Sequence, residues 1–160
     1  RPRGWPWADA AGLPILPGLV RADEVYDIGE IRHALRFTLP STRQEFVYPA
    51  RHFASRIGDE ELLPMGARLR LRADYDLSDF PPGARVIAEA LKRYGMILAD
   101  NGSALYLTGT ADRRWKRKDV DALKRIRAID FEVIVPPPPP ASDTTIRREL
   151  EEGLPGFSAQ

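Results

Sequence analysis

The chain has 160 residues, the size of one domain with a short extension, and 43% of them are hydrophobic while 29% are charged. This composition excludes a wholly disordered chain, and the formal net charge of +1 gives no global reason to expect binding to nucleic acid or to an anionic membrane. The absence of cysteine excludes disulfides, thiolate metal sites and a cysteine nucleophile.

Residues 1–20 hold four prolines and three glycines among bulky apolar side chains, a composition that opposes both a helix and a β-ladder. Trp5, Trp7 and Leu13 nevertheless favour burial, so we expect an irregular segment laid over a larger surface. Because the chain begins at Arg1, without an initiator Met or a signal peptide, we expect a processed chain or a fragment of a longer one. No apolar run approaches the roughly 20 residues that span a bilayer.

Residues 31–39 alternate apolar and polar side chains, which predicts a half-buried strand, and residues 45–50 resume an extended pattern. If residues 41–44 form a four-residue loop, the two strands pair as an antiparallel hairpin. The cross-strand partners in this register are Leu39 with Phe46, Phe37 with Tyr48, Leu35 with Ala50, and His33 with His52. All of these side chains then lie on one face, although Pro49 cannot donate to the ladder and implies an edge or a bulge.

Residues 67–75 show a second clear alternation and predict another strand. The Ser-Asp-Phe-Pro-Pro sequence at 78–82 is typical of a helix start, and residues 83–94 place apolar side chains in one helical stripe. We expect Gly95 to end this helix in a left-handed conformation.

The dipeptide Asn101-Gly102, between the apolar runs 96–100 and 103–108, is the strongest local signal in the chain. Both central residues of a type I′ turn need a positive φ, which Asn-Gly adopts readily. The sequence therefore predicts a two-residue turn in a central, buried hairpin with Leu98 opposite Leu105.

A second helix is predicted at about 118–125, with acidic residues near its start and basic residues near its end, and a last strand at 129–135. Together the elements predict an α+β fold: mostly antiparallel β-hairpins in a sheet packed by one or two short helices, as part of a larger β-rich fold. We expect this domain to occupy residues 1–135, the C-terminal part of a longer fold, and residues 136–160 to form a proline-rich linker and a flexible tail.

His33 and His52 are the only histidines of the chain. As cross-strand neighbours they could act as general acid and base, or bind a metal together with one carboxylate, and the alternative is that hydrogen bonds hold both in a partly buried sheet. Asp100, directly before the Asn-Gly turn, is the candidate carboxylate to act with the two histidines. The alternative is that its side chain only bonds the backbone of its own turn. His33, His52 and Asp100 are therefore the candidate catalytic residues, and no metal or cofactor is assigned to them.

Three acidic residues precede the histidine strand and could supply a carboxylate instead, unless they are solvated loop charges: Asp23, Glu24 and Glu30. Tyr48 would line a cleft beside the histidines. Tyr48, Arg36 and Asn101 are the candidate substrate-binding residues.

The segment 113–127 carries eight basic residues, with Trp115 among them and only two acidic residues. A basic stripe with an aromatic side chain can bind nucleic acid, but such a run is more often a solvated helix face, so binding of nucleic acid is not our expectation. No glycine-rich phosphate loop, GxSxG elbow or HExxH helix is present, and this disfavours the common enzyme classes that use them.

Three stretches of the sequence have the features of a known family: residues 11–21 (AGLPILPGLVR), 30–37 (EIRHALRF) with 48–52 (YPARH), and 95–104 (GMILADNGSA). Over about residues 5–135 the chain resembles the C-terminal half of an uncharacterised family of bacterial, apparently secreted proteins. The resemblance implies an extracellular or periplasmic setting, a missing N-terminal half, and polysaccharide as ligand, but it implies no catalytic residue. The proline-rich tail departs from the family pattern.

Three hypotheses about function follow. The first is an extracellular carbohydrate-directed protein, a fragment of a polysaccharide hydrolase or lyase that uses the candidate catalytic residues. The second is a noncatalytic carbohydrate-binding or structural domain that displays aromatic side chains such as Trp5, Trp7 and Tyr48. The third is a nucleic-acid binder that uses residues 113–127. The expected partners are a polysaccharide and the missing N-terminal half or a partner chain, without a membrane.

Overall fold

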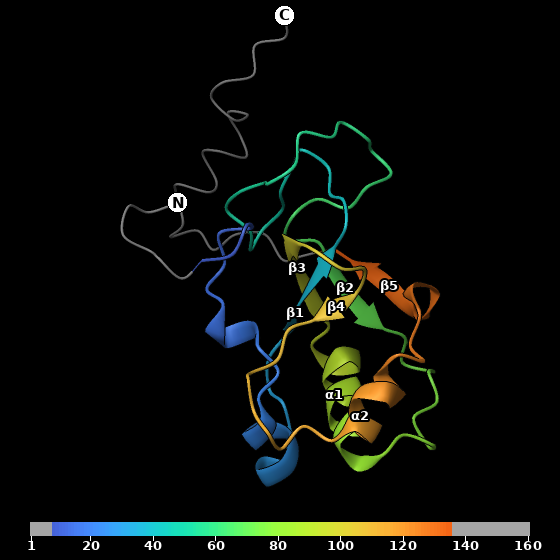
Figure 1. Ribbon diagram of the computed structural model, residues 1–160. Helices are drawn as coiled ribbons and strands as arrows, with labels where there is room; N and C mark the ends of the chain where they lie inside the picture. Colours follow the sequence, from blue (N-terminus) through green and yellow to red (C-terminus); the bar gives the residue numbers. More distant parts are fainter. Residues whose placement is uncertain (1–7, 136–160) are drawn as a thin grey trace, which may run out of the picture.

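The computed structural model describes residues 8–135, which form an α+β fold with a five-stranded mixed sheet and two α-helices (Figure 1). The strands are β1 (Leu35–Leu39), β2 (Arg68–Leu71), β3 (Met96–Asn101), β4 (Tyr106–Leu107) and β5 (Phe131–Ile134). The helices are α1 (Pro82–Arg93) and α2 (Arg117–Leu123), with shorter helical turns at η1 (Leu16–Gly18), η2 (Glu24–Ile28) and η3 (Ala128–Asp130). The predicted α+β class is confirmed. The predicted linker and tail over 136–160, and both Trp5 and Trp7, lie outside the described residues.

The sheet has the strand order β4-β1-β3-β2-β5. Strand β1 runs parallel to β3, while the other three neighbouring pairs are antiparallel. Phe37 pairs with Leu98 and Thr38 pairs with Asp100, so Ala99 is an extra residue that bulges β3. Strand β1, which the sequence predicts to be one arm of a local hairpin, is therefore paired with strands from far along the chain.

Strand β1 is buried on both faces. Leu35 and Phe37 belong to the apolar core, and Arg36 and Thr38, which point to the opposite face, are also buried. On that face Asp9 and Gly18 lie against Arg36, and Gly102 and Ser103 lie against Thr38. This cover explains why an alternating sequence does not leave one side of the strand in water.

The segment before the first strand lies over the sheet through backbone hydrogen bonds. The N–H of Ala11 donates to the carbonyl of Ala99, and the N–H of Val20 donates to the carbonyl of Thr108, both at 3.0 Å. This confirms, for its described part, the expectation of an irregular segment laid over a larger surface.

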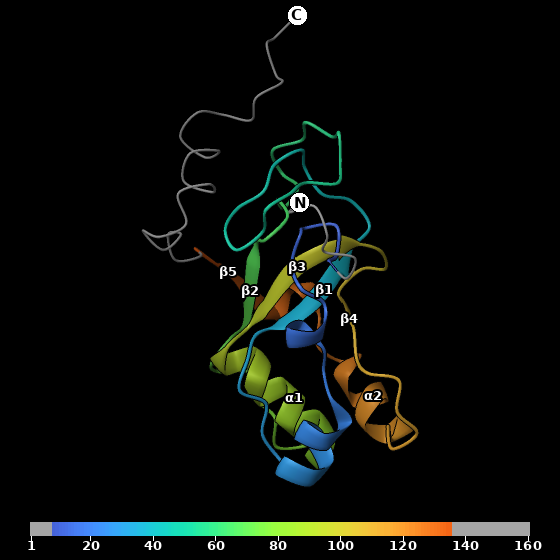
Figure 2. The ribbon, with the colours of Figure 1, turned by 90° about the vertical axis from the view of Figure 1, so that its left-hand side faces the viewer.

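The hairpin predicted from residues 31–39 and 45–50 is wrong. β1 pairs with β3 and β4, while residues 45–50 form only an isolated bridge between Phe46 and Met65. They belong to a long loop at the end of the sheet opposite the helices (Figures 1 and 2). Pro49 lacks the N–H that a ladder needs, whereas β3 and β4 offer β1 regular partners on both edges.

The two-residue hairpin predicted at Asn101-Gly102 is also wrong. β1 lies between β3 and β4, so the chain passes around the end of β1 instead of turning back on itself. The N–H of Gly102 donates to the carbonyl of Leu39 at 2.9 Å, and the residue with a positive φ, of 50°, is Leu105. The long-range pairing of β1 with β3 overrides the local preference of Asn-Gly.

The other predicted elements are confirmed with shifted ends. The helix predicted at 83–94 is α1, and Gly95 follows it with a φ of 71°. The second helix and the strands predicted at 67–75 and 129–135 correspond to α2, β2 and β5, which are shorter than predicted. β5 is a sheet edge, and Val133 on it is 64% exposed, so its predicted apolar face is not buried.

The two α-helices and η2 gather at one end of the sheet (Figure 2), where the buried side chain of Asp119 joins them. Its carboxylate accepts hydrogen bonds from the N–H of Ala84, at 3.3 Å, and from the hydroxyl of Tyr26, at 2.8 Å. An N-terminal helix N–H favours a negative partner, so Asp119 of α2 caps α1 from another element. Gly83 makes this approach possible, because a Cβ there would lie 2.6 Å from the Asp119 carboxylate.

Candidate functional site

His33 lies just before β1 and is held by an acidic residue of η2. Its Nε2 is 3.2 Å from Oε2 of Glu24, and its Nδ1 is 2.9 Å from the carbonyl oxygen of Ala34. Arg21 binds the other carboxylate oxygen of Glu24. Glu24 is one of the three acidic residues that the sequence analysis names as possible carboxylate partners of the histidines. Both ring nitrogens are engaged in a mostly buried cluster, so His33 ties η2 to the start of β1.

His52 lies elsewhere, in the long loop, where its exposed ring stacks on Phe53 at a centroid distance of 5.6 Å. Tyr48 is half-buried in the same loop. The prediction that His33 and His52 face each other across a hairpin is therefore wrong, because the hairpin that would join them does not form.

Arg36 of β1 is the centre of a polar cluster on the face of this strand opposite Leu35 and Phe37. Its guanidinium donates to Oδ2 of Asp9 and to the hydroxyl of Thr108, each at 3.3 Å. The Nε of Arg36 is buried without a hydrogen-bond partner among the described residues. Asp9 was not identified as a site residue from the sequence. It precedes a Gly-containing turn, and this local pattern does not indicate a contact with an arginine far along the chain.

Asp9 is a buried carboxyl on which the charge of Asp100 also acts. Burial raises the pKa of the Asp9 carboxyl above its ordinary value of 3.8, the charge of Asp100 adds to the rise, and the N–H of Leu13 and the Arg36 guanidinium oppose it. The Leu13 N–H donates to Asp9 at 2.9 Å. Of the predicted site residues, Arg36 thus binds Asp9 directly, whereas Asp100 acts on Asp9 only through its charge.

Asp100 and Asn101, at the end of β3, make local contacts. Asp100 accepts a hydrogen bond from the Asn101 N–H at 2.9 Å, which is the turn-type bond that the sequence left as the alternative to catalysis. The Asn101 amide donates to the hydroxyl of Thr42, at 3.3 Å, and Thr42 is fully buried. These contacts fix the junction between β1 and β3, and they leave the predicted catalytic set of His33, His52 and Asp100 dispersed.

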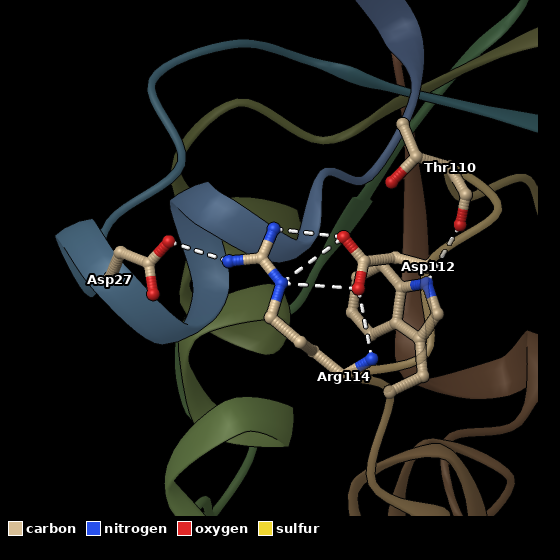
Figure 3. A network of polar contacts seen from close by, with 5 residues as sticks. Asp27, Thr110, Asp112 and Arg114 are labelled. Atoms are coloured by element: carbon tan, nitrogen blue, oxygen red, sulfur yellow. Dashed lines mark hydrogen bonds and ion pairs between the residues drawn. The ribbon is translucent and has the colours of Figure 1, made fainter.

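Three of the eight basic side chains in the segment 113–127 contact carboxylates: Arg114, Arg117 and Lys124. Figure 3 shows Arg114 between two carboxylates, with Nη1 2.6 Å from Asp27 and Nη2 2.8 Å from Asp112. Arg117 and Lys124 both contact Asp121. Phosphate binding needs cations that are free to approach the backbone, and these ion pairs oppose that use.

Trp115 of the same segment makes structural contacts within the protein. Its indole N–H donates to the carbonyl of Thr110 at 2.7 Å, and its ring meets Tyr26 edge-on at 5.7 Å. The one aromatic side chain of the basic stripe is therefore not presented to a nucleic-acid base.

A groove of about 680 Å³ lies along the exposed side of α1. Its lining includes the apolar residues Ile31, Val86 and Ala90, of which Ile31 and Ala90 are buried and Val86 is half-buried. The charged lining residues are Glu30, Arg85, Glu89, Lys92 and Arg93. Tyr94 lies at one end, with the Arg93 guanidinium 5.3 Å from its ring centroid. Charged residues on an exposed helix face are common, so the sequence gave no signal for this groove.

A second hollow, of about 490 Å³, lies beside the first one. The two share Arg85, Glu89 and Lys92, and the second is completed by the segment after β2, including Asp74, Tyr75 and Asp76. We call the two hollows together the α1 groove.

Comparisons with protein-family models, with curated proteins and with solved structures found no match. Among residues 8–135, no group of three or more His, Asp or Glu side chains is placed to hold a metal ion. Within the same described range, no helix has both the length and the apolar character needed to cross a membrane.

Proposed function

We propose that this chain is a carbohydrate-binding module, that its ligand lies in the α1 groove, and that binding needs no catalytic centre in the chain. The observation that supports this best is the lining of the groove, where hydrogen-bond donors and acceptors of both charges surround apolar groups. Ligand sites commonly combine an apolar surface with a few polar groups that fix the orientation of the ligand.

The chemistry of the rim suits hydroxyl groups. The carboxylates of Glu30 and Glu89 only accept hydrogen bonds, whereas Arg85 and Lys92 only donate them. A sugar hydroxyl does both, so neighbouring hydroxyls of one ring can satisfy a carboxylate and a cation at once. Glu30 pairs with Arg32 and Arg93, and Arg85 and Lys92 donate to backbone carbonyls, so a sugar hydroxyl would share these groups with their partners in the chain. Val86 and Tyr94, which are half-buried, offer contact to the C–H faces of the rings.

A polysaccharide hydrolase is the second candidate, and the charge of Asp100 acting on the buried Asp9 carboxyl is the observation that favours it. A carboxyl with a raised pKa near a second carboxylate is an arrangement that glycosidases use for acid–base catalysis. It takes second place because Asp9 is already bound by Arg36 and by the Leu13 N–H. A reducing-sugar assay tests it: activity that disappears in both Asp9→Asn and Asp100→Asn would move the hydrolase to first place.

We also propose an extracellular or periplasmic setting and further polypeptide beside the sheet. The setting follows from the family resemblance alone. The further polypeptide, which the resemblance places in a missing N-terminal half, is supported by the β5 edge, where Ile129, Val133 and Val135 are 74%, 64% and 93% exposed. Native sheet edges are usually protected by charges or by a covering segment.

The binding proposal is tested by titrating the chain with a panel of soluble neutral polysaccharides, using calorimetry and affinity electrophoresis. We expect at least one to bind, and we expect Glu89→Ala to weaken that binding roughly tenfold through loss of a charged acceptor. Glu61→Ala, an exposed residue of the long loop, is the matched control and should bind like the wild type. Absence of binding to the whole panel, or equal losses in both variants, would contradict the proposal.

A further inference from the structure

His33 presents both of its ring nitrogens to hydrogen-bond acceptors. Nε2 lies 3.2 Å from Oε2 of Glu24, and Nδ1 lies 2.9 Å from the carbonyl oxygen of Ala34. Carboxylate and carbonyl oxygens only accept hydrogen bonds, and a neutral imidazole has one N–H and one nitrogen lone pair. Either neutral tautomer therefore turns a lone pair toward an oxygen atom, whereas the imidazolium, with two N–H groups, donates to both partners at once.

The surroundings of the ring favour these two hydrogen bonds over contact with water. The side chains of His33 and Glu24 are only 21% and 11% exposed. Arg21 binds the other carboxylate oxygen of Glu24, and a neighbouring guanidinium favours the ionised form of a carboxyl group. Because Arg21 also offsets the charge of Glu24, the second proton of the ring depends on the two hydrogen bonds more than on the net charge of the cluster.

Other charged residues on the elements beside the ring pair with one another or are exposed. The pairs are Glu30 with Arg32 and with Arg93 of α1, Asp27 of η2 with Arg114, and Arg36 of β1 with Asp9, and Asp23 is exposed. Glu24 is therefore the carboxylate that acts directly on His33.

The contact between Glu24 and His33 fastens η2 to the start of β1. The N–H of Glu30, between the two residues in the chain, donates to the carbonyl of Glu24 at 3.1 Å. Further along η2, the hydroxyl of Tyr26 binds Asp119 of α2. Loss of the contact would therefore free the side of η2 that faces the strand, while the side that faces the helices stays bound.

From this geometry we propose that the contact between Glu24 and His33 is a pH-sensitive latch. The imidazolium donates to Glu24 and to Ala34 and holds η2 against β1. As the pH rises, the ring releases one proton to water, one of the two hydrogen bonds is lost, and η2 separates from the strand. Histidine in an unfolded chain titrates near pH 6.5, so a proton that the folded state holds more strongly stabilises the fold below that pH, and this stabilisation is lost as the pH rises. The latch does not depend on the proposed carbohydrate ligand, so either proposal can fail alone.

Amide hydrogen exchange tests the latch in the whole chain. The Glu30 N–H reports on η2, and the Tyr94 N–H, which donates to the carbonyl of Ala90 at 2.8 Å, reports on α1 as the reference. After correction for the intrinsic exchange rate, protection of the Glu30 N–H should fall roughly tenfold between about pH 6 and about pH 8.5. Protection of the Tyr94 N–H should change less than about twofold over the same range.

Two variants assign the effect to the ring. In His33→Gln, whose side chain does not titrate, protection of the Glu30 N–H should be the same at both pH values. His52→Gln is the matched control, because it removes the exposed histidine of the long loop, and it should keep the fall seen in the wild type. A fall that persists in His33→Gln, or a protection of Glu30 that does not change with pH in the wild type, would overturn the proposal.

If His33→Gln does not fold, the ring nitrogens of the wild type decide. Their ¹⁵N chemical shifts distinguish a protonated nitrogen from an unprotonated one. At about pH 7 both nitrogens of His33 should be protonated, because each faces an acceptor. One unprotonated nitrogen at that pH, with the Glu30 N–H still protected, would overturn the latch.

Discussion

Asp119 is the single polar side chain whose removal should destabilise this fold most. It is 2% exposed and accepts hydrogen bonds from the Ala84 N–H and the Tyr26 hydroxyl. Hydrogen bonds to a charged group contribute about 1.5–3 kcal/mol each, and the 3.3 Å length of the Ala84 bond places it at the low end. A negative charge at a helix N-terminus adds about 0.3–1 kcal/mol.

The substitution Asp119→Ala should therefore lower the free energy of unfolding by about 3–5 kcal/mol, because it also leaves the two donors without their partner. Asp119→Asn keeps an acceptor and should cost about 1–2 kcal/mol. Tyr26→Phe removes only the hydroxyl bond and should also cost about 1–2 kcal/mol. Urea denaturation followed by circular dichroism measures each value.

The matched control for Asp119 is Asp121, two residues further along α2, which is exposed and pairs with Lys124 and Arg117. Exposed ion pairs contribute little, so Asp121→Ala should leave the denaturation midpoint nearly unchanged. If Asp119→Ala costs no more than Asp121→Ala, the carboxylate does not cap α1 and the reasoning is refuted.

Three further predictions concern packing and charge. Gly83→Ala should destabilise the protein by about 1–3 kcal/mol, because its Cβ would meet the Asp119 carboxylate, whereas Gly58→Ala, with open space around it, should be neutral in the same denaturation assay. Asp9 has a raised pKa in the folded state, so it binds more protons folded than unfolded, and its contribution to stability falls as the pH rises from about 4. The stability of the wild type relative to Asp9→Asn should therefore decline over that range, and a rising difference in urea midpoints would contradict this sign. Arg114→Ala should leave the thermal midpoint nearly unchanged in physiological salt, since the network of Figure 3 is exposed.

The sequence predicted the elements whose evidence is local. The period of apolar residues located α1, and the glycine after it took the left-handed conformation that ends a helix. Alternation located β1, β2 and β5, because the two faces of a strand differ over only a few residues. Glu24 was one of three acidic residues that the sequence left open as a carboxylate for the histidines, and the structure places it against His33.

The partners of the strands could not be predicted, because pairing depends on residues far apart in the chain. The hairpin with residues 45–50 matched apolar partners as well as the real pairing does, so hydrophobic agreement alone could not decide between them. Asp9 and Asp119 act through contacts 27 and 35 residues away. The α1 groove is equally non-local, since it forms only when the loops around Glu30 and Asp76 close over one helix.

A substitution at Gly102 distinguishes the predicted Asn-Gly turn from the observed long-range pairing of β1 with β3. A type I′ turn would make Gly102→Ala costly through a positive φ, but the φ of Gly102 is outside the left-handed region. A Cβ on Gly102 would instead lie 3.0 Å from the Thr38 hydroxyl oxygen, so the cost, about 1–3 kcal/mol, should come from crowding against β1.

A double-mutant cycle separates the two causes. Thr38→Ala removes the hydroxyl and the methyl group that would crowd the new Cβ, so Gly102→Ala should cost less than half as much in that background as in the wild type. The coupling energy should fall in the range of about 0.5–3 kcal/mol that is typical of residues in contact. An equal cost in both backgrounds would mean that the backbone conformation of Gly102 sets the penalty, as the Asn-Gly turn requires, and not its contact with Thr38.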